Sequence, residues 1–172
     1  RLGLYAFDKI SEKYIPFTGN MSGIMIADYL MEYFKENDKL NDNSAIVTTI
    51  VSTKMVKALA DYYGIGIIET LTGFKYIGEQ IKFFEEEKKA GRKDVPEFIF
   101  GFEESYGCLA GTYARDKDAV AAVIMLCEVA AYCARKNITL CDRMNELYRK
   151  YGYYRETLIS KTLLGLDGSK II

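Results

Sequence analysis

The sequence predicts an α/β fold, a three-layer domain in which a small mixed, partly parallel sheet lies between helices. Two observations lead to this prediction. Short apolar or β-branched runs alternate along the chain with longer segments in which apolar residues recur every three or four positions. The runs at 45–51 and 65–69 are each followed by such an amphipathic segment, which provides the crossover that parallel strands need.

The elements are expected in a simple alternating order. Strands are expected at 2–7, 13–17, 45–51, 65–69, 97–102 and 154–163. Helices are expected at 22–35, from about 54 to 63, from about 74 to 89, at 118–135 and from 140 to about 152.

Local signals mark the ends of several helices. Ser52 or Thr53 is expected to cap the second helix, and Gly64 is expected to end it. Thr139 and Asp142 have the spacing of a capping box for the last helix. The segment 119–134 is apolar on most sides, so its helix is expected to be deeply buried.

Composition restricts the function classes. The 172 residues are 49% hydrophobic with a net charge of −1, which is enough for one domain with a core, and no basic stripe suggests nucleic acid as a partner. The longest apolar stretch contains Glu128 and is too short for a membrane span. The sequence has no histidine, which excludes Ser-His-Asp and Cys-His chemistry, and its four cysteines form no CxxC pair. Reduced thiols in a cytoplasmic protein are therefore expected.

The most informative segment is the octapeptide 100–107, Phe-Gly-Phe-Glu-Glu-Ser-Tyr-Gly. Carboxylates accept hydrogen bonds from sugar hydroxyls, a serine both donates and accepts, and glycines let the backbone approach a ligand. Glu103 and Glu104 are adjacent, so their side chains point in different directions, and ligand binding fits them better than a shared acid–base role. Two interpretations stay open: a site for a polyhydroxylated ligand, or a solvated turn in which Ser105 caps a short helix.

The octapeptide has candidate neighbours at the same edge of the sheet. The carboxyl ends of parallel strands lie together, and ligands bind there in open α/β sheets. Three loops meet at that edge in the predicted fold: 51–54, 70–75 and 101–107. Thr72, the Gly73 backbone and Lys75 are the foremost candidates, since amide groups at a helix start and a lysine attract an anion. The alternative is an ordinary helix start with Thr72 as its cap.

A charged segment, 115–118, precedes the apolar helix. It either holds a loop by ion pairs, or faces a ligand, or is a charged helix start capped by Asp116 or Asp118.

Together these segments resemble the α-D-phosphohexomutase family, which includes phosphoglucomutases and phosphomannomutases. The stretch 101–107 is similar to the sugar-binding loop of this family, which is usually Gly-Glu-x-Ser-Gly. It departs from that short form by the inserted Phe102 and by Tyr106 in place of the glycine. In both respects it is similar to the longer phosphoglucomutases of the bacterial and mammalian phosphopentomutase-like branch. The stretch 69–79 looks like the Thr-Gly-Phe-Lys-x-Ile-Gly segment, and 115–119 like the charged start of the following helix. The order and spacing also match, over most of residues 1–150.

The resemblance implies an enzyme fragment. Residues 1–12 would end a preceding metal-loop domain, 13–150 would form the third, sugar-binding domain, and 151–172 would be a linker and the first strand of the next domain. Arg1 would be the last residue of an Asp-x-Asp-x-Asp-Arg metal loop, so the three magnesium ligands and the phosphate-carrying serine lie outside this sequence, which does not start with methionine.

The resemblance also implies a reaction and a set of partners. The family interconverts hexose 1-phosphate and 6-phosphate through a phosphoserine, with Mg²⁺ and with glucose 1,6-bisphosphate as intermediate and activator. Glu103 and Ser105 would bind the hexose phosphate, with Thr72, Gly73 and Lys75 beside them, and no catalytic residue lies in this chain. Its partners would be the substrate and the missing domains. Glucose, mannose and pentose phosphate specificity stay open, as does a stand-alone carbohydrate- or nucleotide-binding module.

Overall fold

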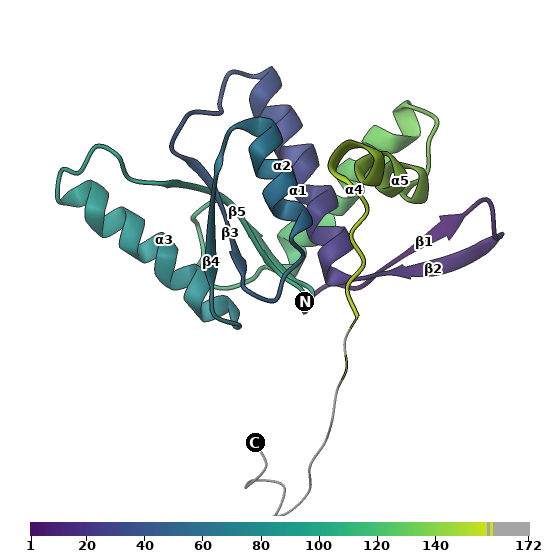
Figure 1. Cartoon of the computed structure of the whole chain (residues 1–172), viewed down its shortest axis with the longest axis horizontal. Coiled ribbons are helices and arrows are strands. Elements are labelled where there is room, and N and C mark those ends of the chain that lie inside the picture. The colour runs from purple at the N-terminus through teal and green to yellow at the C-terminus, as the bar shows by residue number, and fades with distance from the viewer. Residues whose placement is uncertain (158, 160–172) are drawn as a thin grey trace, which may run out of the picture.

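The computed structural model describes residues 1–157 and 159 (Figure 1). The elements in chain order are β1 (Leu4–Asp8), β2 (Lys13–Phe17), α1 (Gly19–Glu36), β3 (Ser44–Thr49), α2 (Met55–Tyr63), β4 (Gly66–Thr70), α3 (Phe74–Lys89), β5 (Glu97–Glu103), β6 (Gly107–Ala110), α4 (Ala119–Arg135) and α5 (Leu140–Tyr151). Of the strand predicted at 154–163, residues 154–157 and 159 form none, and the others lie outside the described residues.

The main sheet has four strands in the order β4-β3-β5-β6. β3 pairs in parallel with both β4 and β5, whereas β6 runs antiparallel to β5. The predicted mixed, partly parallel sheet is therefore confirmed. β6 was not predicted, because it has only four residues and follows directly from a tight turn in the octapeptide.

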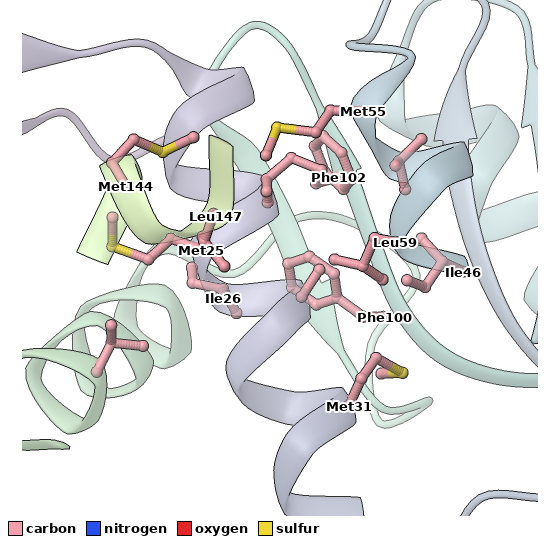
Figure 2. Close-up of a cluster of buried hydrophobic side chains, with 14 of the residues drawn as sticks. Met25, Ile26, Met31, Ile46, Met55, Leu59, Phe100, Phe102, Met144 and Leu147 are labelled. Carbon is pink, nitrogen blue, oxygen red and sulfur yellow. The ribbon is translucent and has the colours of Figure 1, made fainter. Parts of the chain in front are cut away.

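Helices cover both faces of the sheet, which confirms the three-layer α/β architecture (Figure 1). α3 packs on one face, against Val47, Phe98 and Leu109. The other helices lie on the opposite face, where α1, α2 and α5 surround Phe100 and Phe102 of β5 (Figure 2). These two rings stack with their centroids 5.9 Å apart, and the large apolar area they remove from water anchors β5 at the centre of the domain.

A bulge in β5 decides which side chains of this strand face which helices. The pairing with β3 shifts between Ala45 and Ile46, so that Phe98 faces α3 whereas Phe100 faces α1. Gly101 then faces α3 closely, since a Cβ at this position would lie 2.7 Å from the Ile77 side chain. The bulge thereby sets which face of the sheet each of the octapeptide residues 100–102 points to.

The hairpin β1–β2 stands apart from the main sheet, beside α5 (Figure 1). Its strands pair antiparallel, with Leu4 opposite Phe17. The predicted boundary between residues 12 and 13 falls in the turn of this hairpin, and the division of the chain at 1–12, 13–150 and 151–172 stays a prediction.

The predicted deep burial of the helix 119–134 is wrong. One side of α4 packs against α1, α5 and β6, but Val120, Val123 and Ile124 lie on its other side and are exposed. Apolar composition alone does not bury a helix in an outer layer, because only one side has neighbours. Within the described residues, no helix is both long enough and apolar enough to cross a membrane.

Helix ends were predicted with mixed success. The Thr139–Asp142 capping box and the left-handed Gly64 are confirmed. The capping role predicted for Ser52 or Thr53 is taken by Thr53, although the cap position itself is Lys54: Thr53 Oγ1 accepts a hydrogen bond at 3.3 Å from the amide of Met55, the first residue of α2. Ser52 takes no part, because its hydroxyl is engaged with Thr49 instead.

Candidate functional site

Hydroxyl groups tie together the carboxyl ends of the three parallel strands. Thr70 Oγ1 donates to the carbonyl oxygen of Thr48 at 3.2 Å, and Thr48 Oγ1 donates to the carbonyl oxygen of Phe102 at 3.1 Å. The ends of β4, β3 and β5 are thus joined in that order. This confirms that the loops predicted to share one sheet edge do so.

The octapeptide forms a reversal at this edge. β5 continues to Glu103, residues 104–106 turn, and β6 starts at Gly107, which pairs with Glu103. Tyr106 takes a left-handed φ of 68°, which costs free energy for a residue with a Cβ and marks a tightly constrained turn. A Cβ at Gly107 would lie 2.6 Å from Glu103 Oε1 and 2.7 Å from the Lys117 side chain, so a larger residue here would displace these two groups.

Glu103 is the central side chain of this edge. It is only 3% exposed, and its Oε1 has no hydrogen-bond partner within the described part of the chain. A buried carboxylate oxygen without a donor is costly, which marks Glu103 as a candidate functional group. Lys117 Nζ, at 4.0 Å from the same oxygen, supplies a compensating positive charge.

Lys117 comes from the loop between β6 and α4, and sequence reasoning did not select it. Its ammonium lies 5.6 Å from the centre of the Phe74 ring, which places it between α3 and the octapeptide. It also donates to Asp116 at 3.1 Å, and this hydrogen bond lowers the pKa of the Asp116 carboxyl. The sequence contained a hint of its role, because Lys117 belongs to the charged segment 115–118, but the prediction concerned that segment as a whole and singled out no lysine.

The loop that carries Lys117 is anchored at both ends. Arg115 Nη2 donates to both carboxylate oxygens of Glu85 of α3, each at 2.6 Å. The carbonyl of Arg115 packs against Gly78, where a Cβ would approach to 2.1 Å. At the other end Asp118 caps α4, as predicted, and accepts a hydrogen bond from the Tyr113 hydroxyl that lowers the pKa of Asp118.

The Thr-Gly-Phe-Lys segment opens α3 differently from the prediction. Gly73, with a φ of 116°, stands at the cap without a side-chain hydrogen bond, so the prediction of Thr72 as the cap is wrong. Glycine adopts this conformation more easily than residues with a Cβ, and it therefore occupies the cap position. Thr72 lies one residue earlier, in the preceding loop, and is exposed. Lys75 is also exposed and lies over its neighbour, with Nζ 4.7 Å from the centre of the Tyr76 ring.

The predicted site residues therefore fall into two groups. Glu103 and Ser105, the latter half-buried, belong to the reversal. Thr72, Gly73 and Lys75 belong to the start of α3, and Phe74 connects them to the first group through Lys117. Glu104 points to neither group, because its carboxylate accepts a hydrogen bond from Thr49.

The chain matches known protein families and structures over most of its length. The family model described as phosphoglucomutase/phosphomannomutase, alpha/beta/alpha domain III, matches residues 18–151. The chain belongs to this family. A phosphoglucomutase from Staphylococcus aureus (strain MRSA252) is 35% identical over 156 residues, covering 91% of this chain and 26% of that protein. The human glucose 1,6-bisphosphate synthase is 39% identical over 149 residues, covering 85% of this chain and 22% of that protein.

Solved structures share the fold of this phosphohexomutase domain. A phosphomannomutase-type protein from Thermus thermophilus superposes with a TM-score of 0.60 at 20% identity, over 80% of this chain and 26% of that one. An apo N-acetylglucosamine-phosphate mutase of the alpha-D-phosphohexomutase superfamily gives 0.55 at 15% identity, over 85% of this chain and 35% of that one. At these identities the likeness concerns the fold alone. The chain spans about a quarter of the length of the curated relatives it matches.

The described residues offer no donor set for the magnesium ion that the resemblance implies. Among residues 1–157 and 159, no three or more histidine, cysteine, aspartate or glutamate side chains gather closely enough to hold a metal ion. The Glu103 carboxylate faces a lysine, which also disfavours a cation beside it.

Proposed function

We propose that this chain is the sugar-recognition domain of a phosphoglucomutase-like phosphohexomutase. The observation that carries the proposal is the buried Glu103 carboxylate, with one oxygen lacking a donor, beside Lys117 at the carboxyl edge of the sheet. Membership of the domain III family supports the proposal that this edge belongs to an enzyme that handles sugar phosphates.

The geometry suits a hydroxylated, negatively charged ligand. Two neighbouring ring hydroxyls would donate to Glu103, and the Ser105 hydroxyl would exchange hydrogen bonds with another. Lys117 would donate to a sugar oxygen or to a phosphate oxygen, and a hydrogen bond from a charged donor is stronger than one from a neutral donor. Thr72, Gly73 and Lys75 would lie along the path of the phosphate group at the start of α3.

In the whole protein we expect interconversion of hexose 1-phosphate and hexose 6-phosphate through a phosphoserine. The bisphosphate intermediate would present either phosphate to the serine in turn, and this domain would hold the ring in either orientation. The human relative's name, glucose 1,6-bisphosphate synthase, supports the view that a hexose bisphosphate occupies such a site. Holding a reactant in an aligned pose contributes several orders of magnitude to a rate, so a domain that only binds is still essential.

This chain alone would bind and not turn over. The serine that carries the phosphate and the Mg²⁺ ligands would be supplied by other domains of the same polypeptide, which would also be its main partners. Glucose phosphate is the substrate we favour, because the loop has the long form with Phe102 and Tyr106. Mannose and pentose phosphates are the alternatives, and the cytoplasm is the expected location.

The experiment is a titration of the ¹⁵N-labelled chain followed by NMR. Glucose 1-phosphate, glucose 6-phosphate and inorganic phosphate would be added separately, and we expect the sugar phosphates to shift amides of residues 102–107 and 117. A shift by inorganic phosphate alone, or shifts confined to the far side of the domain, would contradict sugar recognition. Interconversion of the two glucose phosphates by the purified chain would contradict the claim that the chemistry lies elsewhere.

A further inference from the structure

The second carboxylate of the octapeptide, that of Glu104, is engaged by side chains of the domain itself. Glu104 Oε2 accepts a hydrogen bond from Thr49 Oγ1 at 3.1 Å, and Thr49 Oγ1 lies 2.9 Å from Ser52 Oγ. Thr49 and Ser52 are both buried, at 0% and 4% exposure. Nothing in the proposed binding role of Glu103 uses these three side chains.

The hydrogen bonds have a definite direction. A hydroxyl group carries a single proton, and an ionised carboxylate is an acceptor only. Thr49 therefore donates to Glu104, and its remaining interaction is to accept from the Ser52 hydroxyl. The result is a relay from Ser52 through Thr49 to Glu104, which connects the end of β3 to the turn of the octapeptide.

The relay holds the turn 104–106, and the position of this turn determines where Ser105 lies in the proposed sugar site. Ser105 lies in the turn 104–106, immediately after the tethered residue. The same turn is fixed on its other side by backbone contacts: the Leu2 amide donates to the Tyr106 carbonyl at 3.1 Å, and the carbonyl of Glu104 packs on Gly19. The relay is the side-chain element of this clamp, and it ends in a charge-assisted hydrogen bond, which is stronger than a neutral one.

We propose that Glu104 is a positioning residue, held by the Ser52–Thr49 relay so that Ser105 and Glu103 are preorganised for the sugar. The adjacent carboxylates then have separate tasks: Glu103 faces the ligand, and Glu104 fixes the turn to the sheet. This inference rests on the proposed function. It assigns to Glu104 a role that the sequence did not suggest, since the two adjacent carboxylates were considered there only as ligands or as an acid–base pair.

The test compares Thr49→Val, which keeps the shape and removes the hydroxyl, with Thr49→Ser, which keeps the hydroxyl. Glu104→Ala removes the carboxylate at the other end of the relay. Glu104 lies half-buried in the turn, so this substitution leaves the core undisturbed. Thr112→Val, at an exposed position, is the control. Two quantities would be measured on the 172-residue chain: amide hydrogen exchange of residues 105–107, and the dissociation constant for glucose 1-phosphate by NMR.

We expect Thr49→Val and Glu104→Ala each to speed exchange of these amides about tenfold and to weaken binding about five- to tenfold. Thr49→Ser and Thr112→Val should stay near the original values. Unchanged exchange in both disruptive variants would overturn the proposal, as would faster exchange with unchanged affinity, or an equal effect of Thr49→Ser.

The outcome also separates the two proposals. If the original chain does not bind glucose 1-phosphate, the proposed function falls and the positioning role falls with it. If the original chain binds and the disruptive variants bind equally well, only the positioning role falls.

Discussion

Gly19 provides the sharpest test of how the octapeptide is held. It is the first residue of α1, and a Cβ added there would lie 2.1 Å from the carbonyl oxygen of Glu104 and 2.7 Å from the amide nitrogen of Tyr106. Ordinary contact begins at 3.4 Å, so the helix and the turn must separate by roughly 1.3 Å. Both groups are backbone, and no rotation of a side chain relieves the overlap.

Gly19→Ala should therefore be destabilising although alanine is the better helix former. Overpacking of this kind costs about 1–3 kcal/mol, and the helix preference returns about 0.5–1 kcal/mol, so the expected net loss lies between about 0 and 2.5 kcal/mol and centres near 1 kcal/mol. A shift of this size in the turn should also weaken sugar phosphate binding at least about tenfold. Urea unfolding gives the first quantity and an NMR titration the second.

The matched control is Gly3→Ala, where an added Cβ meets nothing within 4 Å. This variant should differ from the original chain by less than about 0.5 kcal/mol and should bind equally well. If Gly19→Ala behaved like Gly3→Ala in both assays, the close approach of α1 to the turn would not exist in solution, and the reasoning would be refuted.

Three further predictions concern charge and burial. Lys117→Met should weaken binding of glucose 1-phosphate about tenfold in an NMR titration, because a donor and a neutralising charge are lost beside Glu103; equal affinity would exclude Lys117 from the site. Asp28→Ala should lower the free energy of unfolding, measured with urea, by about 3–5 kcal/mol, because fully buried Asp28 is the shared ion-pair partner of Arg143 and Lys150. A decrease below about 1 kcal/mol would contradict this role of Asp28. Burial raises the pKa of the Cys108 thiol from 9 to about 11, so the folded chain keeps a proton that the unfolded chain loses between these values. This contribution to the free energy of unfolding should be fully present below pH 9 and should be lost as the pH rises to about 11, by up to about 2–3 kcal/mol. Cys108→Ala should lose less stability over this pH range. An identical pH profile of the free energy of unfolding in the variant would contradict the assignment of this loss to Cys108.

Strand–helix alternation was sufficient to predict the layers and most of the elements. The run 45–51 is short and β-branched, and its residues up to Thr49 lie in β3, which is buried along its whole length between two helical layers. Ile50 and Val51 lie beyond the strand and are exposed. The capping box at Thr139 was equally predictable, since its two hydrogen bonds join residues three positions apart. Signals of this kind depend on near neighbours in the sequence, which is why they survive without knowledge of the fold.

What the sequence did not predict depends on contacts between distant segments. The burial of α4 was overestimated because the number of layers above a helix is a property of the fold, not of the helix. β6 was missed because its strand character comes from pairing with β5 rather than from its own four residues. Lys117 was not selected because its position beside Glu103 depends on the fold, which brings the loop after β6 next to the end of β5.

The candidate site shows the same division. Residue chemistry and the predicted sheet edge selected the octapeptide and the segment at Thr72, and the family resemblance then named Glu103 and Ser105 within the octapeptide. The resemblance named Glu103 and not Glu104 as the sugar-binding carboxylate, but the different surroundings of the two side chains were not predictable, because only the fold places Thr49 beside Glu104 and Lys117 beside Glu103.

The most direct test of the central claim is the affinity of Glu103→Gln for glucose 1-phosphate. The substitution keeps the size of the side chain and removes the charge and one acceptor site, and Glu79→Gln, at an exposed position on α3, is the matched control. If Glu103 accepts hydrogen bonds from the sugar, the dissociation constant should rise about ten- to hundredfold in Glu103→Gln and stay unchanged in Glu79→Gln. An unchanged dissociation constant in Glu103→Gln would contradict the assignment of this buried carboxylate as the sugar-binding group.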